Sequence, residues 1–397
     1  MLNFNYCNPT QYVYGPGEHL NTGTLLTPMV KGKILLHYGG GSIIRTGLLA
    51  RIRESLRSAG IDWVELGGVK PNPSITLVRK GVALCRREGV GLVLAVGGGS
   101  VIDSAKGIAV GVPNSGDVWE LYSHKGSVPQ HEPLPVATVL TLPAAGSENS
   151  PNSVLTNEAT GRKLGFKHMK LRPVLSIVDP TLFLTLPQEQ MAYGACDMLC
   201  HVFERYFTRT EQTDLSDALA EATMRTIMRE ACILNTGLNN VDAWGQLALC
   251  GTIAHNDILG VGREQSWACH GLEHELSAVY DVPHGAGLAV IVPAYMEAMW
   301  PHHPGIYAQW AVNVMGVTAQ RHTAAVIREG IVRLRAWYRQ LRLPQTMREL
   351  GIPADADFDT MAQAACRVYG AGAAVPTLPG IHPLTASDAS AIYKAAI

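Results

Sequence analysis

Residues 92–106 read LVLAVGGGSVIDSAK, and this stretch decides the fold. A short apolar run with the character of a buried strand leads directly into Gly97, Gly98, Gly99 and Ser100, and a helical pattern follows. A strand that turns through glycines into a helix is the unit from which helix-covered parallel sheets are built. The flanking sequence is therefore expected to repeat this alternation.

Short apolar runs and longer helical patterns do alternate on both sides of this stretch. Residues 43–59 and 74–88 place apolar side chains three and four positions apart, which predicts helices. Residues 153–168 differ, because two short runs flank the sequence EATG, and they predict a hairpin. The strands expected for the sheet are KILLHY (33–38), WVEL (63–66), LVLAV (92–96), PVATVLTL (135–142) and VLSIV (174–178).

The character of the sequence changes at Pro187, after which strand-like runs nearly vanish and stretches rich in Ala, Leu, Met and Arg follow. A proline can open a helix at its first turn, so Pro187 marks a natural boundary. Two domains also suit a length of 397 residues, because single cores stop growing at roughly 250 to 300 residues. We expect an α/β domain with a mostly parallel sheet in residues 1–187 and an all-α domain in residues 188–397.

Composition excludes several classes of protein. Apolar residues make up 47% of the chain and charged residues 16%, so much apolar surface must be buried, and we expect at least a homodimer. The net charge of -1 favours neither nucleic acid nor an anionic membrane as a partner. Without a leader-like start or an apolar run of roughly 20 residues, a cytoplasmic protein is expected. The 8 cysteines follow no disulfide or paired CxxC pattern.

The glycine-rich turn at residues 97–100 suits a phosphate group. Glycines let the backbone approach an anion, and the positive end of the following helix favours negative charge. The pattern matches neither the Rossmann nor the P-loop fingerprint, and the glycines alone are equally compatible with a tight turn. Ligands of such sheets bind at the carboxyl ends of the strands, which adds Thr138, Thr141, Leu142 and Ser147 as candidates.

A second glycine cluster, Gly39, Gly40, Gly41 and Ser42, follows the first strand, where dinucleotide folds usually recognise the adenosine ribose. An acidic residue there would bind a free 2′-hydroxyl and repel a 2′-phosphate, but none is present. Ser42 can donate a hydrogen bond, and Arg45 lies three positions further on. We therefore predict NADP(H) over NAD(H); the alternative is a plain turn beside a solvated arginine.

A candidate metal site lies in the second half. Asp197 and His201 stand four residues apart in MAYGACDMLCHVFERYF, so they share one side of a helix. An aspartate in such apolar surroundings needs a cation or strong donors, although a buried Asp–His pair would also satisfy it. The segment WACHGLEHELSAVYDVPHGAG adds His270, His274 and His284. Three imidazoles and one carboxylate suit Zn²⁺ or Fe²⁺.

Cys196, Cys200 and Cys269 each precede a candidate ligand. Neighbouring residues on a helix diverge by about 100°, so Cys196 and Cys200 cannot face the same point as the ligands that follow them. We expect the cysteines to be packing residues.

Taken together, these motifs resemble a known family over nearly the full chain. YGGGSI, AVGGGSVIDSAKG, TLPAAGSE, VDP, D-x3-H and H-x3-H followed by PHG are similar to the iron-containing (group III) alcohol dehydrogenases, in particular the butanol-dehydrogenase-like branch of broad aldehyde reductases. The resemblance implies the architecture shared with dehydroquinate synthase: a dinucleotide-binding domain in residues 1–187, a helical metal-binding and catalytic domain in residues 188–397, and an active site between them. The metal ligands that it implies are Asp197, His201, His270 and His284.

The resemblance also implies roles around the cofactor. This branch looks NADP-dependent, His274 is placed near the substrate, and Asp103 and Lys163 are placed near the nicotinamide. His274 and Asp103 are the candidate catalytic residues. The expected cofactor contacts are Gly39, Gly40, Gly41, Ser42, Arg45, Gly97, Gly98, Gly99, Ser100, Asp103, Thr138, Thr141, Leu142, Ser147, Lys163 and Leu182.

The reaction expected from this resemblance is reversible hydride transfer between NADP(H) and a short- to medium-chain primary alcohol or aldehyde. His274 is a candidate for proton exchange, because an unperturbed imidazole has a pKa of about 6.5. Three alternatives stay open: a glycerol-type polyol dehydrogenase, a non-redox lyase of the dehydroquinate-synthase type, and a binding protein with a retired site. The absence of lysine between Lys170 and Lys394 weakens the lyase, whose substrate is strongly anionic.

Overall fold

The computed structural model describes residues 1–124 and 126–397. The chain divides into two compact units, one formed by Cys7–Leu186 and one formed by Pro187–Ile397 together with Met1–Tyr6. The backbone N–H of Leu2, for example, donates to the carbonyl of Gly262 at 2.7 Å. Within the described part of the chain, no helix combines the length and apolar character needed to cross a membrane.

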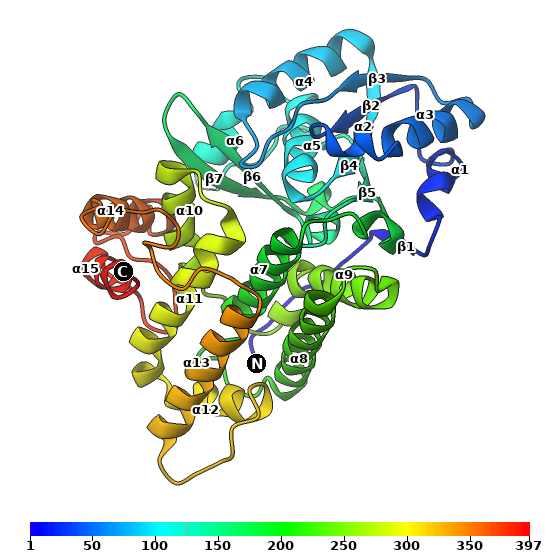
Figure 1. Ribbon diagram of the computed structural model, residues 1–397. Helices are drawn as coiled ribbons and strands as arrows, with labels where there is room; N and C mark the ends of the chain where they lie inside the picture. The colour runs from blue at the N-terminus through cyan, green and yellow to red at the C-terminus, as the bar shows by residue number, and fades with distance from the viewer. Residues whose placement is uncertain (125) are drawn as a thin grey trace. The chain divides into compact units, whose positions relative to one another are not determined.

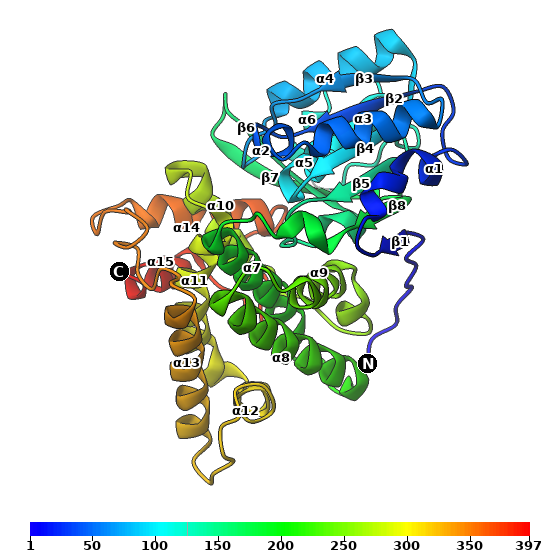
Figure 2. The same cartoon turned by 45° about the vertical axis from the view of Figure 1, so that its right-hand side comes forward.

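The unit Cys7–Leu186 is built on a six-stranded sheet in which every neighbouring pair of strands is parallel, in the order β1-β8-β5-β4-β2-β3 (Figure 1; β8 is labelled in Figure 2). A separate antiparallel pair, β6-β7, forms the expected hairpin. The predicted α/β fold class is confirmed. The strands are β1 (Gln11–Tyr14), β2 (Lys33–Tyr38), β3 (Trp63–Leu66), β4 (Val90–Gly97), β5 (Val136–Leu140), β6 (Asn152–Asn157), β7 (Arg162–Lys167) and β8 (Leu175–Val178).

Helices cover the sheet because its strands carry apolar side chains on both faces. Ile34 and Leu36 of β2 pack in one buried cluster with Ile52 and Leu56 of a helix. Another helix packs against β4. The helices of this unit are α1 (Thr22–Leu26), α2 (Ser42–Arg45), α3 (Leu48–Ser58), α4 (Ile75–Glu88), α5 (Gly99–Gly111) and α6 (Trp119–Ser123), with 3-10 turns η1 (Glu18–Asn21), η2 (Ser147–Asn149), η3 (Met169–Leu171) and η4 (Pro180–Phe183).

Two details differ from the sequence-based expectation. The single helix predicted for residues 43–59 is wrong, because Gly47 adopts φ +72° and separates α2 from α3. A left-handed residue cannot continue a right-handed helix, and glycine adopts that conformation at little cost. Strand β1 was not predicted either; it is a four-residue edge strand that pairs only with β8 among the described strands.

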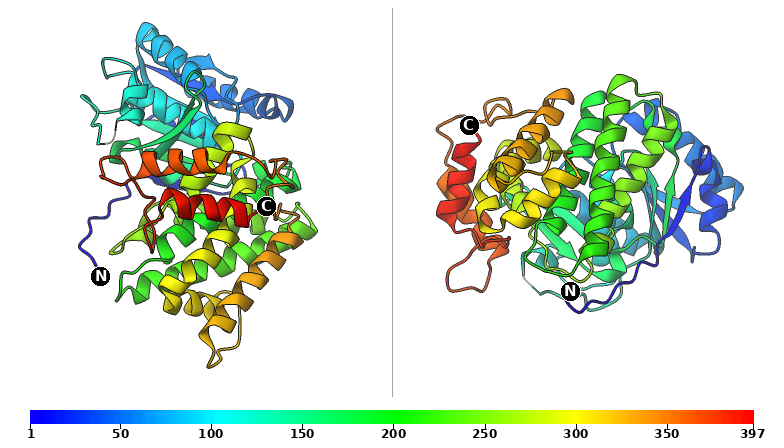
Figure 3. Two further views of the ribbon diagram at one scale, coloured as in Figure 1. Left: turned by 90° about the vertical axis from the view of Figure 1, so that its left-hand side faces the viewer. Right: turned by 90° about the horizontal axis from the view of Figure 1, so that it is seen from below.

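The unit that includes Pro187–Ile397 is helical, and its described residues contain no strand beyond an isolated bridge between Leu378 and Leu384. Helix α7 contacts α8, α9 and α11 (Figure 2), and α14 lies beside α15, the red helix of Figure 3. The elements are α7 (Gln188–Tyr206), α8 (Asp214–Thr236), α9 (Val241–His255), η5 (Ile258–Gly260), α10 (Ala268–Tyr280), α11 (His284–Met299), η6 (Trp300–His302), α12 (Pro304–Asn313), α13 (Thr323–Gln340), α14 (Phe358–Tyr369) and α15 (Ala386–Ala395).

The strand order creates a switch point in the sheet. After β2 the chain moves outward to β3 and then returns to the other side of β2 as β4. The turns that follow β2 and β4 therefore leave the same carboxyl edge side by side in opposite directions. Open α/β sheets bind ligands at such points.

Candidate functional site

The glycine-rich turn after β4 is packed too tightly for larger residues. Gly97 ends β4 and Gly99 opens α5. A Cβ added to Gly97 would overlap the side chain of Val101, and one added to Gly98 would lie 3.0 Å from Cβ of Leu142. Ser100 follows in the first turn of α5, so backbone N–H groups and the positive end of a 13-residue helix meet at the switch point. These residues fit the phosphates of a dinucleotide.

The turn after β2 carries a cation and no free acid. A Cβ on Gly41 would lie 2.6 Å from a terminal nitrogen of Arg45, so this guanidinium folds back against Gly41. The nearby carboxylate of Glu65 accepts two hydrogen bonds from Arg53, at 2.8 and 2.6 Å, and one from Tyr38 at 3.1 Å. The acid closest to this turn in the sheet is thus already paired within the unit.

Asp103 connects α5 to the hairpin. One carboxylate oxygen accepts from the hydroxyl of Ser147 at 2.5 Å, and the other accepts from the N–H of Val154 at 3.0 Å. Burial raises the pKa of Asp103 and outweighs the attraction of the neighbouring lysines Lys106 and Lys163, the second of which lies in β7. Asp103 and Ser147 therefore lie together.

The other expected cofactor contacts are spread along the same sheet. Thr138 is fully buried inside β5 and donates to the hydroxyl of Ser176 at 3.1 Å, so its side chain is not exposed at the edge. Thr141 follows β5, and its N–H donates to the carbonyl of Gly97 at 3.1 Å. Leu182 lies in η4, after β8.

The candidate metal ligands converge on one oxygen. Asp197 and His201 lie one turn apart on α7, His270 lies in the first turn of α10, and His284 is the first residue of α11 rather than part of a free turn. Oδ1 of Asp197 lies 3.3 Å from Nδ1 of His201, 3.6 Å from Nε2 of His270 and 3.7 Å from Nε2 of His284.

These separations fit a shared cation better than hydrogen bonds. Oδ1 of Asp197, Nδ1 of His201 and Nε2 of His270 are buried, and none has a hydrogen-bond partner among the residues that the structure describes. Two ligands at about 2.0–2.2 Å from one tetrahedral metal lie about 3.3–3.6 Å apart. Leaving three such polar atoms unsatisfied in a protein interior is costly, so the group fits a divalent metal.

The protonation states of His201, His270 and Asp197 also bear on metal binding. Burial, together with the positive charges near it, holds the pKa of His201 well below its usual value, so this imidazole is neutral. Burial opposes protonation of His270 as well, but the neighbouring carboxylates of Asp197 and Glu204 outweigh it and raise the pKa of that imidazole well above its usual value. Burial raises the pKa of Asp197, yet the neighbouring imidazoles outweigh it and hold that pKa below its usual value. The carboxylate of Asp197 is therefore charged, as a metal ligand has to be, and His270 would release its proton on binding a metal.

His274 lies beside this group rather than within it. Its Nδ1 lies 3.2 Å from the hydroxyl of Tyr369, at the end of α14. The His274 ring centroid is 6.3 Å from that of His270 and 5.6 Å from that of His284. The hydroxyl of Tyr369 is thus a hydrogen-bond partner that orients the imidazole of His274.

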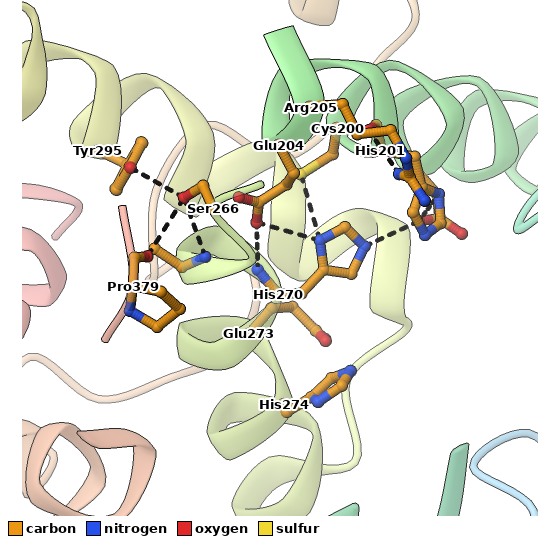
Figure 4. Close-up of polar contacts among 12 residues, drawn as sticks. Cys200, His201, Glu204, Arg205, Ser266, His270, Glu273, His274, Tyr295 and Pro379 are labelled. Carbon is orange, nitrogen blue, oxygen red and sulfur yellow. Dashed lines mark hydrogen bonds and ion pairs between the residues drawn. The ribbon is translucent and has the colours of Figure 1, made fainter. Parts of the chain in front are cut away.

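Glu204, Glu273 and Trp267 lie near the ligands and were not predicted from the sequence. Glu204 and Glu273 are buried carboxylates that contact His270 and His284 respectively (Figure 4 shows the Glu204 contact). The ring centroid of Trp267 lies 5.3 Å from that of His270, and this bulky residue adopts φ +65°, an outlier for its type. Glutamates on amphipathic helices are so common that only their apolar surroundings, as in HVFERYF, could have signalled these contacts.

Cys196, Cys200 and Cys269 are buried as expected, and Cys200 also has a specific neighbour. Its Sγ lies 3.8 Å from Nδ1 of His270, the nitrogen that faces away from Asp197. Cys200, Glu204 and His270 thereby form a second group with metal-ligand spacing, as do Glu273, His274 and His284. Burial raises the pKa of Cys200 well above its usual value, which favours the neutral thiol over a thiolate ligand.

The sequence matches one family in both of its halves. Residues 9–180 match the iron-containing alcohol dehydrogenase family, and residues 191–397 match the C-terminal part of the Fe-containing alcohol dehydrogenase family. The chain belongs to the iron-containing alcohol dehydrogenases. This alcohol dehydrogenase is an oxidoreductase that interconverts alcohols and aldehydes with a nicotinamide dinucleotide and a divalent metal. The resemblance seen in the motifs is confirmed, and the redox activity is favoured over the lyase.

Relatives of this alcohol dehydrogenase cover nearly its whole length. It is 37% identical over 395 residues, 99% of both chains, to NADH-dependent butanol dehydrogenase A of Clostridium acetobutylicum. It is 32% identical to the NADPH-dependent aldehyde reductase YqhD of Escherichia coli, covering 89% of this chain and 90% of that protein. The crystal structure of an NADH-dependent butanol dehydrogenase A from Thermotoga maritima superposes with a TM-score of 0.94 at 37% identity, covering 100% of this chain and 99% of that one.

Proposed function

We propose that this enzyme transfers hydride between NADP(H) and short- to medium-chain primary alcohols or aldehydes, with one Fe²⁺ or Zn²⁺ ion. The proposed ligands are Asp197, His201, His270 and His284. The proposal rests on three buried ligand atoms that have no hydrogen-bond partner among the described residues. Nδ1 of His201 lies 3.3 Å and Nε2 of His270 lies 3.6 Å from Oδ1 of Asp197. Carboxylate and imidazole donors suit iron and zinc alike.

A bound divalent metal would supply Lewis-acid polarisation of the substrate oxygen, worth several kcal/mol in the transition state. The chain's own residues have to deliver or accept a proton at that oxygen. We assign this exchange to His274, directly or through water, because its ring lies beside the proposed ligands, with its centroid 6.3 Å from that of His270 and 5.6 Å from that of His284. The hydroxyl of Tyr369, 3.2 Å from Nδ1 of His274, holds this ring in place beside them.

The preference for NADP(H) is supported by the turn after β2. The guanidinium of Arg45 lies over Gly41, and the carboxylate of Glu65 is paired with Arg53 and Tyr38. A 2′-phosphate would meet a cation there and no unpaired acid from β3. Because the named relatives include an NADH-dependent and an NADPH-dependent enzyme, the family alone leaves the choice of dinucleotide open.

A single assay tests the proposal. Purified enzyme is stripped of metal, reconstituted separately with Fe²⁺, Zn²⁺ or no metal, and supplied with a panel of aldehydes and either NADPH or NADH. We expect turnover only in a metal-containing arm and a higher kcat/KM with NADPH. A clear preference for NADH would overturn the cofactor assignment, and full activity without metal would overturn the metal site. The homodimer and the cytoplasmic location expected from the sequence stay predictions.

A further inference from the structure

Two buried glutamates contact the ring nitrogens of His270 and His284 that face away from Asp197. Glu204 is 2% exposed and Glu273 is fully buried. Oε1 of Glu204 lies 3.2 Å from Nδ1 of His270 (Figure 4), and Oε2 of Glu273 contacts Nδ1 of His284. In both histidines the opposite nitrogen, Nε2, faces Asp197.

We infer that Glu204 and Glu273 are positioning residues that hold these two imidazoles in the orientation needed to bind the metal. This inference rests on the proposed function. A carboxylate that accepts a hydrogen bond from Nδ1–H fixes the tautomer, so Nε2 carries its lone pair toward the metal and becomes more basic. Two separate carboxylates in the same arrangement on two helices favour this role over chance packing.

Glu273 is itself held by its surroundings. The hydroxyl of Ser277, one turn further along α10, donates to Oε1 of Glu273. A Cβ added to Gly287 of α11 would lie 2.8 Å from Cγ and 2.9 Å from Oε1 of Glu273, so only a glycine leaves room for this carboxylate. The glutamate matters most for His284, whose side chain is 26% exposed and therefore less confined than that of His270, at 6%.

Glu204 also contacts the backbone at the start of α10. Its Oε1 also accepts the backbone N–H of His270 at 3.0 Å, in the first turn of α10. Backbone N–H groups at a helix start have no partner within the helix, and a negative charge is favourable there. Loss of Glu204 would therefore weaken α10 as well as the ring orientation, and Glu273 gives the cleaner test.

The test measures metal binding without turnover. Metal-free full-length enzyme is titrated with Co²⁺ by visible absorption and with Zn²⁺ against a chromophoric chelator, and bound metal is counted per chain. For E273Q we expect about 10- to 100-fold weaker binding and a changed Co²⁺ spectrum. Glu275→Gln, a partly exposed carboxylate on the same helix, serves as the matched control and should bind like the parent.

A second variant, at Gly287, tests Glu273 through a residue that packs against its side chain. Gly287→Ala should displace the carboxylate and weaken metal binding like E273Q, although alanine by itself favours a helix by about 1 kcal/mol over glycine. In a Glu273→Ala background the added methyl group meets no carboxylate, so Gly287→Ala should then change the affinity less than twofold. This non-additivity separates a positioning role from a general loss of stability.

The outcomes distinguish this inference from the function on which it rests. If the parent binds no metal, or Asp197→Asn binds it as tightly as the parent, the proposed metal site fails. If Asp197→Asn loses the metal while E273Q keeps the parent affinity and spectrum, the positioning role is overturned. More than one metal per chain would also overturn it, because Glu204 or Glu273 would then act as a ligand in one of the two additional groups.

Discussion

The ammonium nitrogen of Lys106 lies 2.7 Å from the backbone oxygen of Ser147, deep inside the α/β unit. The same nitrogen donates to the carbonyls of Ser150 at 2.9 Å and Asn152 at 2.8 Å, although Lys106 is fully buried. One side chain of α5 thereby holds the loop between β5 and β6, including Ser147, which also contacts Asp103.

Replacing Lys106 with Met should destabilise this unit and loosen the loop. Three carbonyl oxygens would lose a charged donor, and removing one member of a buried polar network costs on the order of 3 kcal/mol. We expect a lower urea midpoint and weaker dinucleotide binding, measured by quenching of protein fluorescence. Lys80→Met, at an exposed position of α4, is the control. Parent-like stability and affinity of K106M would contradict this role.

Replacing Arg45 with Ala should change the preference between the two dinucleotides. The guanidinium over Gly41 is the charged group proposed to meet the 2′-phosphate. We expect kcat/KM for NADPH to fall about tenfold, which corresponds to about 1.4 kcal/mol, and kcat/KM for NADH to change little. Arg57→Ala on the exposed side of α3 controls for loss of surface charge. Equal losses with both dinucleotides would remove Arg45 from 2′-phosphate recognition.

Replacing His270 or His274 with Ala should separate binding from proton exchange. His270→Ala removes a proposed ligand and should abolish tight metal binding and activity together. His274→Ala removes an imidazole outside the group around Asp197, so it should retain the metal but slow turnover about 100-fold. Metal content and steady-state rates are measured on the same preparations. The assignment of His274 is wrong if its variant loses the metal.

Acid should destabilise the α/β unit through His37 of β2. Burial lowers the pKa of His37 from 6.5 to about 4, opposed by its hydrogen bond to the carbonyl of Leu66. Below about pH 6.5 the unfolded chain therefore binds a proton at His37, whereas the folded unit does not bind it until the pH approaches 4. Stability is lost as the pH falls from 6.5 toward 4. At pH 5, which is about 1.5 units below the pKa of the unfolded chain, the loss in the free energy of unfolding is about 2 kcal/mol.

The measurement compares urea unfolding at pH 7 and pH 5. His37→Gln is uncharged at both pH values, so its free energy of unfolding should depend less on pH in this window, although the variant is less stable at pH 7. His131→Gln, at an exposed position, should keep the slope of the parent. An unchanged slope in H37Q would show that His37 is not the group responsible.

Much of the sheet could be predicted because its central strands are buried on both faces. Continuous apolar runs such as LVLAV indicate strands wherever they stand in the chain. The edge strand β1 lacks such a run, since QYVY is only partly buried. The break at Gly47 was also missed, because apolar spacing continues across it and only the glycine's left-handed backbone separates the two helices.

Part of the candidate site could likewise be predicted from the sequence, and part of it could not. Asp197 and His201 could be paired because helical spacing is local, and the histidine-dense segment was visible by composition. The contact between Glu204 and His270 spans 66 positions and depends on how α7 packs beside α10. No local pattern encodes such a contact, and the same is true of Tyr369 beside His274, which are separated by 95 positions.

The N-terminal segment Met1–Tyr6 has a consequence for how the protein is made. Its residue Leu2 pairs with Gly262 of the helical unit, yet the ribosome synthesises the whole of Cys7–Leu186 between them. The α/β unit is contiguous and can fold as it emerges, whereas the opening segment has to wait for a partner made much later. Translation thus imposes an order of folding in which a segment synthesised before the α/β unit is placed after it.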